Sequence, residues 1–484
     1  MIVWAVVRAL VQSITIDEAF TYTFYAARPI RVVFDPGSTN HLLNSLLMWF
    51  TTRAFGTSNI TVRLPALLGA VLYVSVCYFL CKGITSKFSL RLPLFICLTC
   101  NPFILDYMVA ARGYSLANAF LLAAAAVPVW HRVRGWPSLP ASCAWASVAL
   151  GFSFTSNVSF AFVDGAAFLA ILIWASQRRE GQSVWRIAGF CALPGLAVAV
   201  LLCGYAVLHW ERADLYWGAH SLKEMRQSLV ESSFYQLAPQ IRGSFYKVLR
   251  FLQPRLLPVL GLLSAFQLAV VGFDGSWRRD ARARWLAGLA AALLGIVTLS
   301  VTLSWLAFRF DDLPLPLGRT GIYFVPLCTL LAGIIAALPP AKYPVSRWLS
   351  HGITAVLICL ACYFLLCLRL SYFREYRVDA DVKEVYSVLA RINHTYGVSD
   401  VNATGLYVAP LNYYADLSKR ETFPEFKQED PELSVGRFVY VIDAVAWRDF
   451  IEKEKLVVVY RGKFSDVVVA VRSDGPIPPA MIEP

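Results

Sequence analysis

Charged residues are scarce in this chain of 484 residues. Asp, Glu, Lys and Arg make up 16% of it, whereas an ordinary soluble domain is about a quarter charged. Hydrophobic residues make up 57% and aromatic residues 14%. This composition excludes a soluble globular protein for most of the length and predicts an α-helical polytopic membrane protein.

Cysteine is missing from the more polar C-terminal part. All eleven cysteines, from Cys77 to Cys367, lie in or beside apolar runs. This distribution argues against a disulfide-stapled secreted protein, in which the exposed parts carry the bridges. Cys359 and Cys362 form a CxxC spacing, but they fall inside an apolar run, where cysteine more often serves as a small packing residue.

Several signals of function are absent as well. No nucleic-acid motif is recognisable, and the net charge of +12 needs no nucleic acid to explain it, because much of the excess lies in short loops between apolar runs. The start of the chain lacks the basic region and the small-residue cleavage site of a secretory signal. The C-terminal part has no Gly-rich phosphate loop, metal-ligand spacing or nucleophile signature.

Apolar runs of about 20 residues are abundant, and each is long enough to cross a bilayer. Hydropathy predicts about eleven transmembrane helices, near residues 1–14, 64–82, 90–106, 114–130, 141–155, 158–176, 186–208, 255–273, 285–304, 321–338 and 349–369. The first run is too short for a bilayer of about 30 Å. We therefore expect the true start to lie upstream, or residues to have been lost.

Lys and Arg gather in alternate loops, and such loops favour the cytoplasm. The basic groups are Lys82, Lys87 and Arg91; His131, Arg132 and Arg134; Arg178, Arg179 and Arg186; Arg278, Arg279, Arg282 and Arg284; and Lys342 and Arg347. Eleven crossings place all five groups on one side. We predict that Asp17, Asp106, the loops 209–250 and 305–320 and the C-terminal tail lie on the other side, outside a bacterial inner membrane.

The composition changes near Ser371, where charges become frequent and apolar runs shorten to five or six residues. We predict a membrane domain over 1–370 and a small extracytoplasmic α/β domain over 371–484. Within the latter we expect helices at 379–396, 410–419 and 446–454, and strands at 404–409, 437–443, 456–461 and 466–472. The tail PIPPAMIEP should be frayed, and the domain should serve as a cap or recognition module.

Two acidic residues, Asp17 and Glu18, stand at the outer end of the first apolar run in the string ITIDEAFTY. An ionised carboxylate at a membrane boundary is costly unless it meets water, a partner or a ligand, so such acids are candidates for function. Further polar residues follow at the same predicted face. They are His41 and Asn44 in an aromatic-rich passage, Asp106 and Arg112 in NPFILDYMVAARGYSL, and Arg319 and Tyr323 in RTGIYFVP.

The strings ITIDEAFTY, NHLLNSLL, RLPALLGA and NPFILDYMVAARGYSL resemble polytopic glycosyltransferases of the GT-C superfamily. They are similar to the bacterial members of the protein O-mannosyltransferase and lipid A aminoarabinose transferase group. The resemblance covers roughly residues 1–340. It implies an enzyme that passes a sugar from a polyprenyl-phosphate carrier to an extracytoplasmic acceptor, which is a lipid, a glycan or a protein.

Carried over residue by residue, the resemblance gives Asp17 the acidic position that activates the acceptor or binds a metal, with Glu18 as second choice. Asp106 matches the acid of the second outer loop, and Arg112 the arginine that follows it. The chain departs from the pattern in two places. Ala110 stands where many relatives have the glutamate of QEAR, and Leu42 replaces the proline that often follows the position of His41.

These residue types suit sugar transfer. Asp17 is the predicted base, and Arg112 or Arg319 the predicted clamp on the donor phosphate, because a guanidinium can bind phosphate oxygens with two hydrogen bonds. His41, Tyr114 and Tyr323 complete the predicted substrate-binding set. Structural readings stay open for His41 as a packing residue and for the arginines as interfacial anchors. A divalent ion held by Asp17 and Asp106 is a further hypothesis, since hard cations prefer oxygen ligands.

The loop 209–250 mixes Trp and Tyr with Lys and Arg. Aromatic faces suit sugar rings, but aromatic residues gather at any membrane interface.

Two other classes of protein stay open. One is a transporter or lipid flippase, against which stand the missing internal repeat and the collection of polar groups at one face. The other is a catalytically inactive scaffold, suggested by Ala110 and the short first run.

Overall fold

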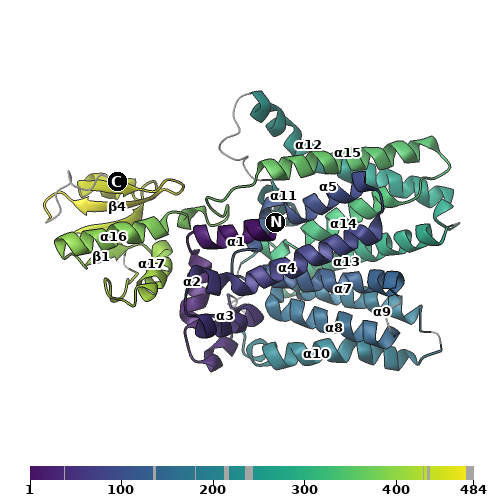
Figure 1. Ribbon diagram of the computed structural model, residues 1–484, viewed down its shortest axis with the longest axis horizontal. Coiled ribbons are helices and arrows are strands. Elements are labelled where there is room, and N and C mark those ends of the chain that lie inside the picture. The colour runs from purple at the N-terminus through teal and green to yellow at the C-terminus, as the bar shows by residue number, and fades with distance from the viewer. Residues whose placement is uncertain are drawn as a thin grey trace.

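The computed structural model describes residues 1–37, 39–134, 138–179, 181–211, 217–234, 244–278, 280–428, 430–432 and 437–475. Helices dominate up to residue 366 (Figure 1). They are α1 (Ile2–Val11), α2 (Ile16–Thr21), α3 (Leu42–Phe55), α4 (Asn59–Ile84), α5 (Phe88–Thr99), α6 (Pro102–Tyr107), α7 (Tyr114–Arg134), α8 (Leu139–Ser156), α9 (Ala161–Ser176), α10 (Val184–Leu208), α11 (Leu222–Ser233), α12 (Ser244–Asp274), α13 (Ala281–Asp311), α14 (Phe324–Ala337) and α15 (Pro344–Leu366). Short 3-10 or π-helical turns join several of them, among them Tyr22–Ala26, Val158–Phe160 and Gly318–Gly321.

Ten of the eleven predicted spans each correspond to one helix, whereas the span 90–106 covers two, α5 and α6. In the described part of the chain, eight helical stretches are long and apolar enough to cross a membrane, and they include α4, α7, α9, α10, α12, α13, α14 and α15. The predicted span 141–155 is the 18-residue helix α8, while α1 and α5 are shorter apolar helices. These long apolar helices make the chain an integral multi-pass membrane protein, and a helix suits hydrocarbon because all its backbone hydrogen bonds form within the segment.

The helices run alongside one another in a long bundle (Figure 1). Two contacts join three of the basic groups at one end of the bundle. Arg282 donates to the carbonyl of Ile84 (3.3 Å), and the guanidinium of Arg132 lies 5.0 Å from the ring centre of Trp285. The opposite ends of the helices carry α2, the segment between α13 and α14 and the described residues of the C-terminal part (Figure 1).

A four-stranded sheet forms after residue 400, with the strands β1 (Val401–Ala403), β2 (Val439–Asp443), β3 (Leu456–Arg461) and β4 (Val467–Arg472). Their order is β1-β2-β4-β3; β1 and β2 are parallel, and the other neighbours are antiparallel. The helices α16 (Val382–Tyr396), α17 (Gly405–Leu417) and α18 (Arg448–Lys453) accompany the sheet. We refer to residues 382–475 as the C-terminal unit; the domain boundary at 370/371 stays a prediction.

Most predicted elements of this unit are confirmed, but the strand at 404–409 is wrong. These residues begin α17 instead. The helix buries Tyr407, Leu411 and Tyr414, which recur at the spacing of a helical face, and this packing overrides the local β-propensity of the string LYV. The predicted frayed tail, residues 476–484, lies outside the described residues.

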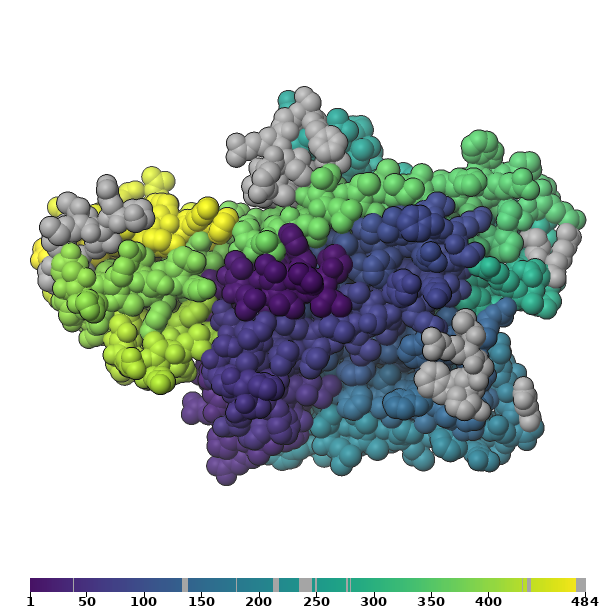
Figure 2. Space-filling view, viewed as in Figure 1, coloured from purple at the N-terminus to yellow at the C-terminus, as the bar shows by residue number. Residues whose placement is uncertain are grey.

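The C-terminal unit packs against the start of the chain. Ile14, Ala19 and Tyr22 share one buried apolar cluster with residues of the unit such as Val385 and Tyr413. Figure 2 shows the green C-terminal residues meeting the purple N-terminal ones along one border. The segment that carries Asp17 is therefore enclosed between the membrane helices and the C-terminal unit.

Candidate functional site

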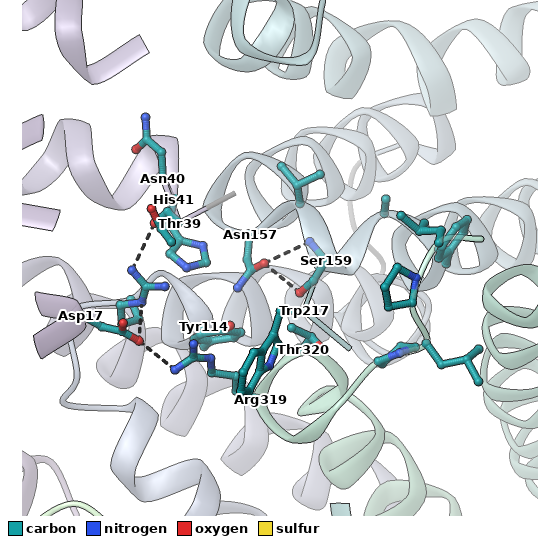
Figure 3. A pocket seen from close by; sticks show the side chains of 18 of the residues that line it. Asp17, Thr39, Asn40, His41, Tyr114, Asn157, Ser159, Trp217, Arg319 and Thr320 are labelled. Atoms are coloured by element: carbon teal, nitrogen blue, oxygen red, sulfur yellow. Dashed lines mark hydrogen bonds and ion pairs between the residues drawn. The ribbon is translucent and has the colours of Figure 1, made fainter. Parts of the chain in front are cut away.

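A cavity of about 420 Å³ opens at the end of the bundle opposite the basic loops. It is lined by the turn before α3, the turn before α7, the start of α9, two tryptophans and the segment between α13 and α14 (Figure 3). The lining residues are Asp17, Thr39, Asn40, His41, Arg112, Tyr114, Asn157, Val158, Ser159, Ala161, Phe162, Trp210, Trp217, Leu313, Pro314, Leu315, Pro316, Arg319 and Thr320.

Asp17 lies in the first turn of α2, which is fixed at its start by a capping box. Thr15 accepts a hydrogen bond from the Glu18 amide, and Glu18 accepts one from the Thr15 amide, which satisfies two backbone donors at the helix start. The Asp17 side chain is 21% exposed. Among the described residues that line the cavity, it is the single carboxylate.

Three groups from distant parts of the chain converge on Asp17. Arg319 Nη1 donates to Oδ2 at 2.7 Å, the hydroxyl of Tyr376 donates to the same oxygen at 2.7 Å, and Arg112 Nε lies 3.5 Å from it. Burial by itself would raise the pKa of Asp17, but the charges of Arg112 and Arg319 and the Tyr376 hydrogen bond outweigh it and lower the pKa to about 2. The carboxylate is therefore ionised at neutral pH.

Arg112 reaches the cavity from a tight turn before α7. Its Nη1 donates to the carbonyl of Thr39 (3.1 Å) and to the hydroxyl of Thr21 (3.2 Å). The next residue, Gly113, has a φ of +72°, and a Cβ there would lie 2.2 Å from the Ser156 carbonyl oxygen. Only glycine fits this position, so the string ARGY places Arg112 and Tyr114 on either side of a turn that no other residue would allow.

Arg319 comes from the turn before α14. Its Nη1 donates to Asp17 and also to the hydroxyl of Tyr376 (3.0 Å), and its guanidinium lies 5.9 Å from the ring centre of Trp217. Figure 3 shows Arg319 and Trp217 together on one side of the cavity, with Asp17 at its end. The cavity thus combines two fixed guanidinium groups with an indole face.

Three buried nitrogen atoms in the wall have no hydrogen-bond partner among the described residues. They are His41 Nε2, Asn157 Nδ2 and Trp210 Nε1. Burial and the charges of Arg112 and Arg319 hold the pKa of His41 well below its usual value, so the imidazole is neutral at pH 7. Buried polar groups are normally paired, and these three are available to the oxygen atoms of a polar ligand.

Glu18 does not line the cavity, although it adjoins Asp17 in the sequence. Its carboxylate is fully buried and accepts hydrogen bonds from Arg63 Nε and Nη2, both at 2.8 Å, and from the Ala111 amide at 2.9 Å. Residues one apart on a helix point about 100° away from each other. The structure therefore places Glu18 in a buried ion pair with Arg63, outside the cavity.

Asp106 is also placed apart from the cavity. Arg8 Nη2 donates to its Oδ1 at 2.7 Å, and the Arg374 amide donates to its Oδ2 at 2.8 Å. Both oxygens are thus taken, and the side chain is 3% exposed. Asp17 and Asp106 therefore do not fit a shared divalent ion, and among the described residues no group of three or more His, Cys, Asp and Glu side chains could hold one.

Tyr323 is fully buried below the cavity. Its ring packs edge-on against Phe160 with a centre distance of 5.0 Å, and its hydroxyl accepts a hydrogen bond from Ser300 at 3.5 Å. It does not line the cavity and packs inside the helix bundle. Asn44 likewise turns inward and donates to the Ala111 carbonyl (3.0 Å).

The structure brings Asp17, His41, Arg112, Tyr114 and Arg319 together around one cavity. It adds Asn157 and Tyr376. Asn157 follows α8 in an apolar stretch, and an Asn at such a helix end is a detectable signal. Tyr376 lies 359 positions from Asp17, in the part of the chain predicted to be a cap or recognition module.

Fold and site together define an integral membrane protein with an arginine-rich polar cavity at one end of its bundle. Among solved structures, the chain is similar to ArnT from Cupriavidus metallidurans in the apo state, with 10% identity over 100% of this chain and 97% of that chain and a TM-score of 0.47. It is similar to the same protein bound to undecaprenyl phosphate, with 11% identity over 98% and 97% and a TM-score of 0.49.

The Archaeoglobus fulgidus oligosaccharyltransferase in the apo form is a further match, with 13% identity over 89% of this chain and 60% of that chain and a TM-score of 0.37. These proteins are GT-C glycosyltransferases, the group that the sequence strings resemble. No family model matches the sequence, and no curated protein matches it. With TM-scores below 0.5 the likeness concerns the course of the chain, and the chemistry below rests on this chain's own residues.

Proposed function

We propose that this protein is a membrane glycosyltransferase that moves a sugar from a polyprenyl-phosphate-linked donor to a hydroxyl-bearing acceptor outside a bacterial inner membrane. The observation that carries the proposal is the convergence of Asp17, Arg112 and Arg319 on one cavity at a membrane boundary. A base, two cations and aromatic walls are what transfer from a phosphate-linked sugar requires. The acceptor's class, whether lipid, glycan or protein, is part of the test.

The arginines suit the departing phosphate. As the bond between the sugar's anomeric carbon and the phosphate oxygen breaks, its electron pair goes to that oxygen, and negative charge grows there. Arg112 and Arg319 lie on either side of Asp17 and can share this charge through directed hydrogen bonds. The charges on the lining groups sum to one positive charge for the described residues, which a single phosphodiester anion would neutralise.

Asp17 suits the acceptor. The acceptor oxygen forms a bond to the anomeric carbon while its proton passes to the carboxylate. Arg319, Tyr376 and Arg112 all contact Asp17 at Oδ2, which leaves Oδ1 to take that proton. The sugar ring itself would lie against Trp217, with its hydroxyls near Asn157 Nδ2 and Trp210 Nε1.

A pKa of about 2 makes Asp17 a weak base in the protein without substrate. The donor phosphate changes this balance, because its negative charge competes for the same guanidinium groups and thereby raises the pKa of Asp17. The order of binding follows from this competition: the donor enters first, and its arrival turns Asp17 into a useful base for the acceptor. No step in this account is assigned to a metal ion.

The first test is transfer of radiolabelled sugar in membranes supplied with a panel of undecaprenyl-phosphate sugars. We expect Asp17→Asn to lower transfer by about 10²-fold or more, since general-base catalysis contributes about 10²–10⁴-fold. Arg319→Lys keeps the charge but loses the planar fork, and should reduce transfer while retaining part of it. Asp35→Asn is the matched control, because Asp35 is an exposed acid of the same outer segment.

Two outcomes would contradict the proposal. Full transfer by the Asp17→Asn variant would show that Asp17 is not the catalytic base. If the native chain transfers no sugar from any donor but moves a labelled lipid across the membrane, the protein belongs among the transporters or flippases. Protein levels in the membrane, measured for each variant, separate these outcomes from simple misfolding.

A further inference from the structure

The residues that join α15 to the C-terminal unit pass directly behind the cavity. We refer to residues 369–381 as the connecting segment. Three consecutive residues of it bind three different outer elements. The Arg374 amide donates to Asp106 (2.8 Å), Glu375 accepts from Tyr107 and from Ser232 (3.2 Å), and Tyr376 donates to Asp17.

Tyr376 makes the contact that matters most for the cavity. Its hydroxyl donates to Asp17 Oδ2 at 2.7 Å and accepts from Arg319 Nη1 at 3.0 Å. The side chain is buried, and its ring lies 6.4 Å from that of Tyr107, edge to face. One hydroxyl therefore fixes both the carboxylate and the arginine that would share the donor phosphate with it.

The same part of the chain also holds the backbone that carries Asp17. Asp379 Oδ2 accepts from the Ile16 amide at 2.8 Å, at the first turn of α2. The Tyr414 hydroxyl accepts from the Ile14 amide at 2.9 Å, and Ser13 Oγ donates to the Ala380 carbonyl at 2.8 Å. Each of these bonds joins residues more than 360 positions apart in the sequence.

Charged and titratable groups surround this joint. Burial raises the pKa of Glu375 and raises that of Asp379 well above the usual value, while the Tyr376 hydrogen bond contributes to the low pKa of Asp17. Of these acids, Asp17 is the one that has two guanidinium groups beside it. Among the three, Asp17 is also the carboxylate that lines the cavity.

We propose that the C-terminal unit and its connecting segment are the positioning element of the active site, and that Tyr376 is the positioning residue through which they act on Asp17. This inference rests on the proposed function and gives the C-terminal unit a role other than that of a recognition cap. The unit keeps α2 at one distance from Arg319, and Tyr376 keeps the carboxylate in one rotamer. The donor phosphate then meets a geometry that is already in place.

Tyr376→Phe tests the catalytic consequence in the full chain, because it removes one hydroxyl and keeps the ring. We expect the turnover rate to fall about 10- to 100-fold with the KM for the donor changed less than about twofold, since small misplacements of a reacting group cost about that much. The acid limb of kcat/KM should move to higher pH, because the ionised Asp17 loses a hydrogen-bond donor. A purely structural role would leave that limb in place.

Tyr372→Phe is the matched control. Tyr372 lies on the same connecting segment, and its hydroxyl accepts from Arg369, away from Asp17. This variant should keep the native turnover rate and pH profile. Equal effects of the two substitutions would overturn the role of Tyr376.

A second measurement does not depend on catalysis. Asp379→Ala removes the acceptor of the Ile16 amide, so hydrogen exchange in residues 14–21 should quicken about tenfold or more, while Tyr372→Phe leaves it unchanged. Unchanged exchange in Asp379→Ala would overturn the positioning role even if transfer is active. If the native chain transfers no sugar but exchange responds as expected, the proposed function fails and the joint between the C-terminal unit and α2 stands.

Discussion

Asp17 and Glu18 show how strongly the partners of a side chain decide what it can do. The Glu18 carboxylate is fully buried and accepts hydrogen bonds from Arg63 and the Ala111 amide. Asp17 retains contact with the cavity, and its two guanidinium neighbours come from different loops. A buried and fully paired carboxylate is held in place by several strong bonds, whereas the one at the cavity can change partners when a charged ligand enters.

This exchange of partners predicts a difference between two pH profiles. With the free protein, Asp17 has a pKa of about 2, and its ionised form is the active base, so kcat/KM should stay level from neutral pH down to about pH 3. In the donor complex the phosphate shares the arginines, the pKa of Asp17 rises, and kcat should decline at a higher pH than kcat/KM. Steady-state kinetics between pH 3 and 8 measure both. If kcat and kcat/KM decline at the same pH, the arginines do not exchange Asp17 for the donor phosphate.

Substitutions of two other buried acids, Asp106 and Asp164, should have different effects on the stability of the fold. Asp106 is paired with Arg8, so Asp106→Asn leaves a buried guanidinium without its counter-charge and should destabilise the fold by about 3 kcal/mol. Asp164, in α9, is 6% exposed, and its two carboxylate oxygens have no hydrogen bond from any described residue. Asp164→Asn should change stability by less than about 1 kcal/mol, or increase it.

Thermal unfolding of both variants in the same detergent checks this contrast. Equal losses in the two would show that Asp164 has a partner of comparable strength. Loss of transfer by Asp164→Asn at unchanged stability would instead assign a functional role to an acid below the cavity.

At the level of elements, the turn between α6 and α7 determines where the Arg112 side chain points. Gly113 has a positive φ and approaches the Ser156 carbonyl and the His41 side chain closely. Gly113→Ala should cost at least about 1–2 kcal/mol from the left-handed conformation alone, with a further cost from the clash. Gly165→Ala is the control, because a Cβ on Gly165 of α9 meets nothing within 4 Å. Unfolding temperature and transfer should both drop in the first variant and not in the second.

The helical elements could be predicted from the sequence because their cause is local. Runs such as 186–208 and 349–369 are apolar over a bilayer's thickness, and the ends of α10 and α15 lie within five residues of these limits. The start of α17 could not be predicted from the sequence, since the burial of Tyr407 and Leu411 depends on packing partners elsewhere in the chain. Local composition predicts a span well and an amphipathic fold in water less well.

The cavity was predictable in part for the same reason. Asp17, Arg112 and Arg319 stand at outer ends of apolar runs, and topology alone brings such ends to one face. Which of Asp17 and Glu18 turns toward the cavity depends on Arg63 of α4, and no spacing reveals that pairing. Tyr376 was missed because its contact spans 359 positions and two regions of different composition.

At the scale of the whole molecule, one arrangement connects charge, cavity and C-terminal unit. Three of the basic loops meet at one end of the bundle, as the contacts of Arg282 and Arg132 show, and the cavity and the C-terminal unit lie at the other. Loops rich in Lys and Arg stay in the cytoplasm. The cavity should therefore open outside the inner membrane, where a lipid-linked donor and an extracytoplasmic acceptor can meet.

Reporter fusions test this orientation directly. Green fluorescent protein matures in the cytoplasm, so a fusion after Lys342, beside the basic loop between α14 and α15, should fluoresce, while a fusion after Asp474 in the C-terminal unit should stay dark. Alkaline phosphatase at the same two points should give the reverse, because it needs an oxidising compartment. The two reporters control for each other's expression. Fluorescence from the C-terminal fusion would place Asp17, Arg112 and Arg319 in the cytoplasm, and the donor would then have to present its sugar on the inner leaflet.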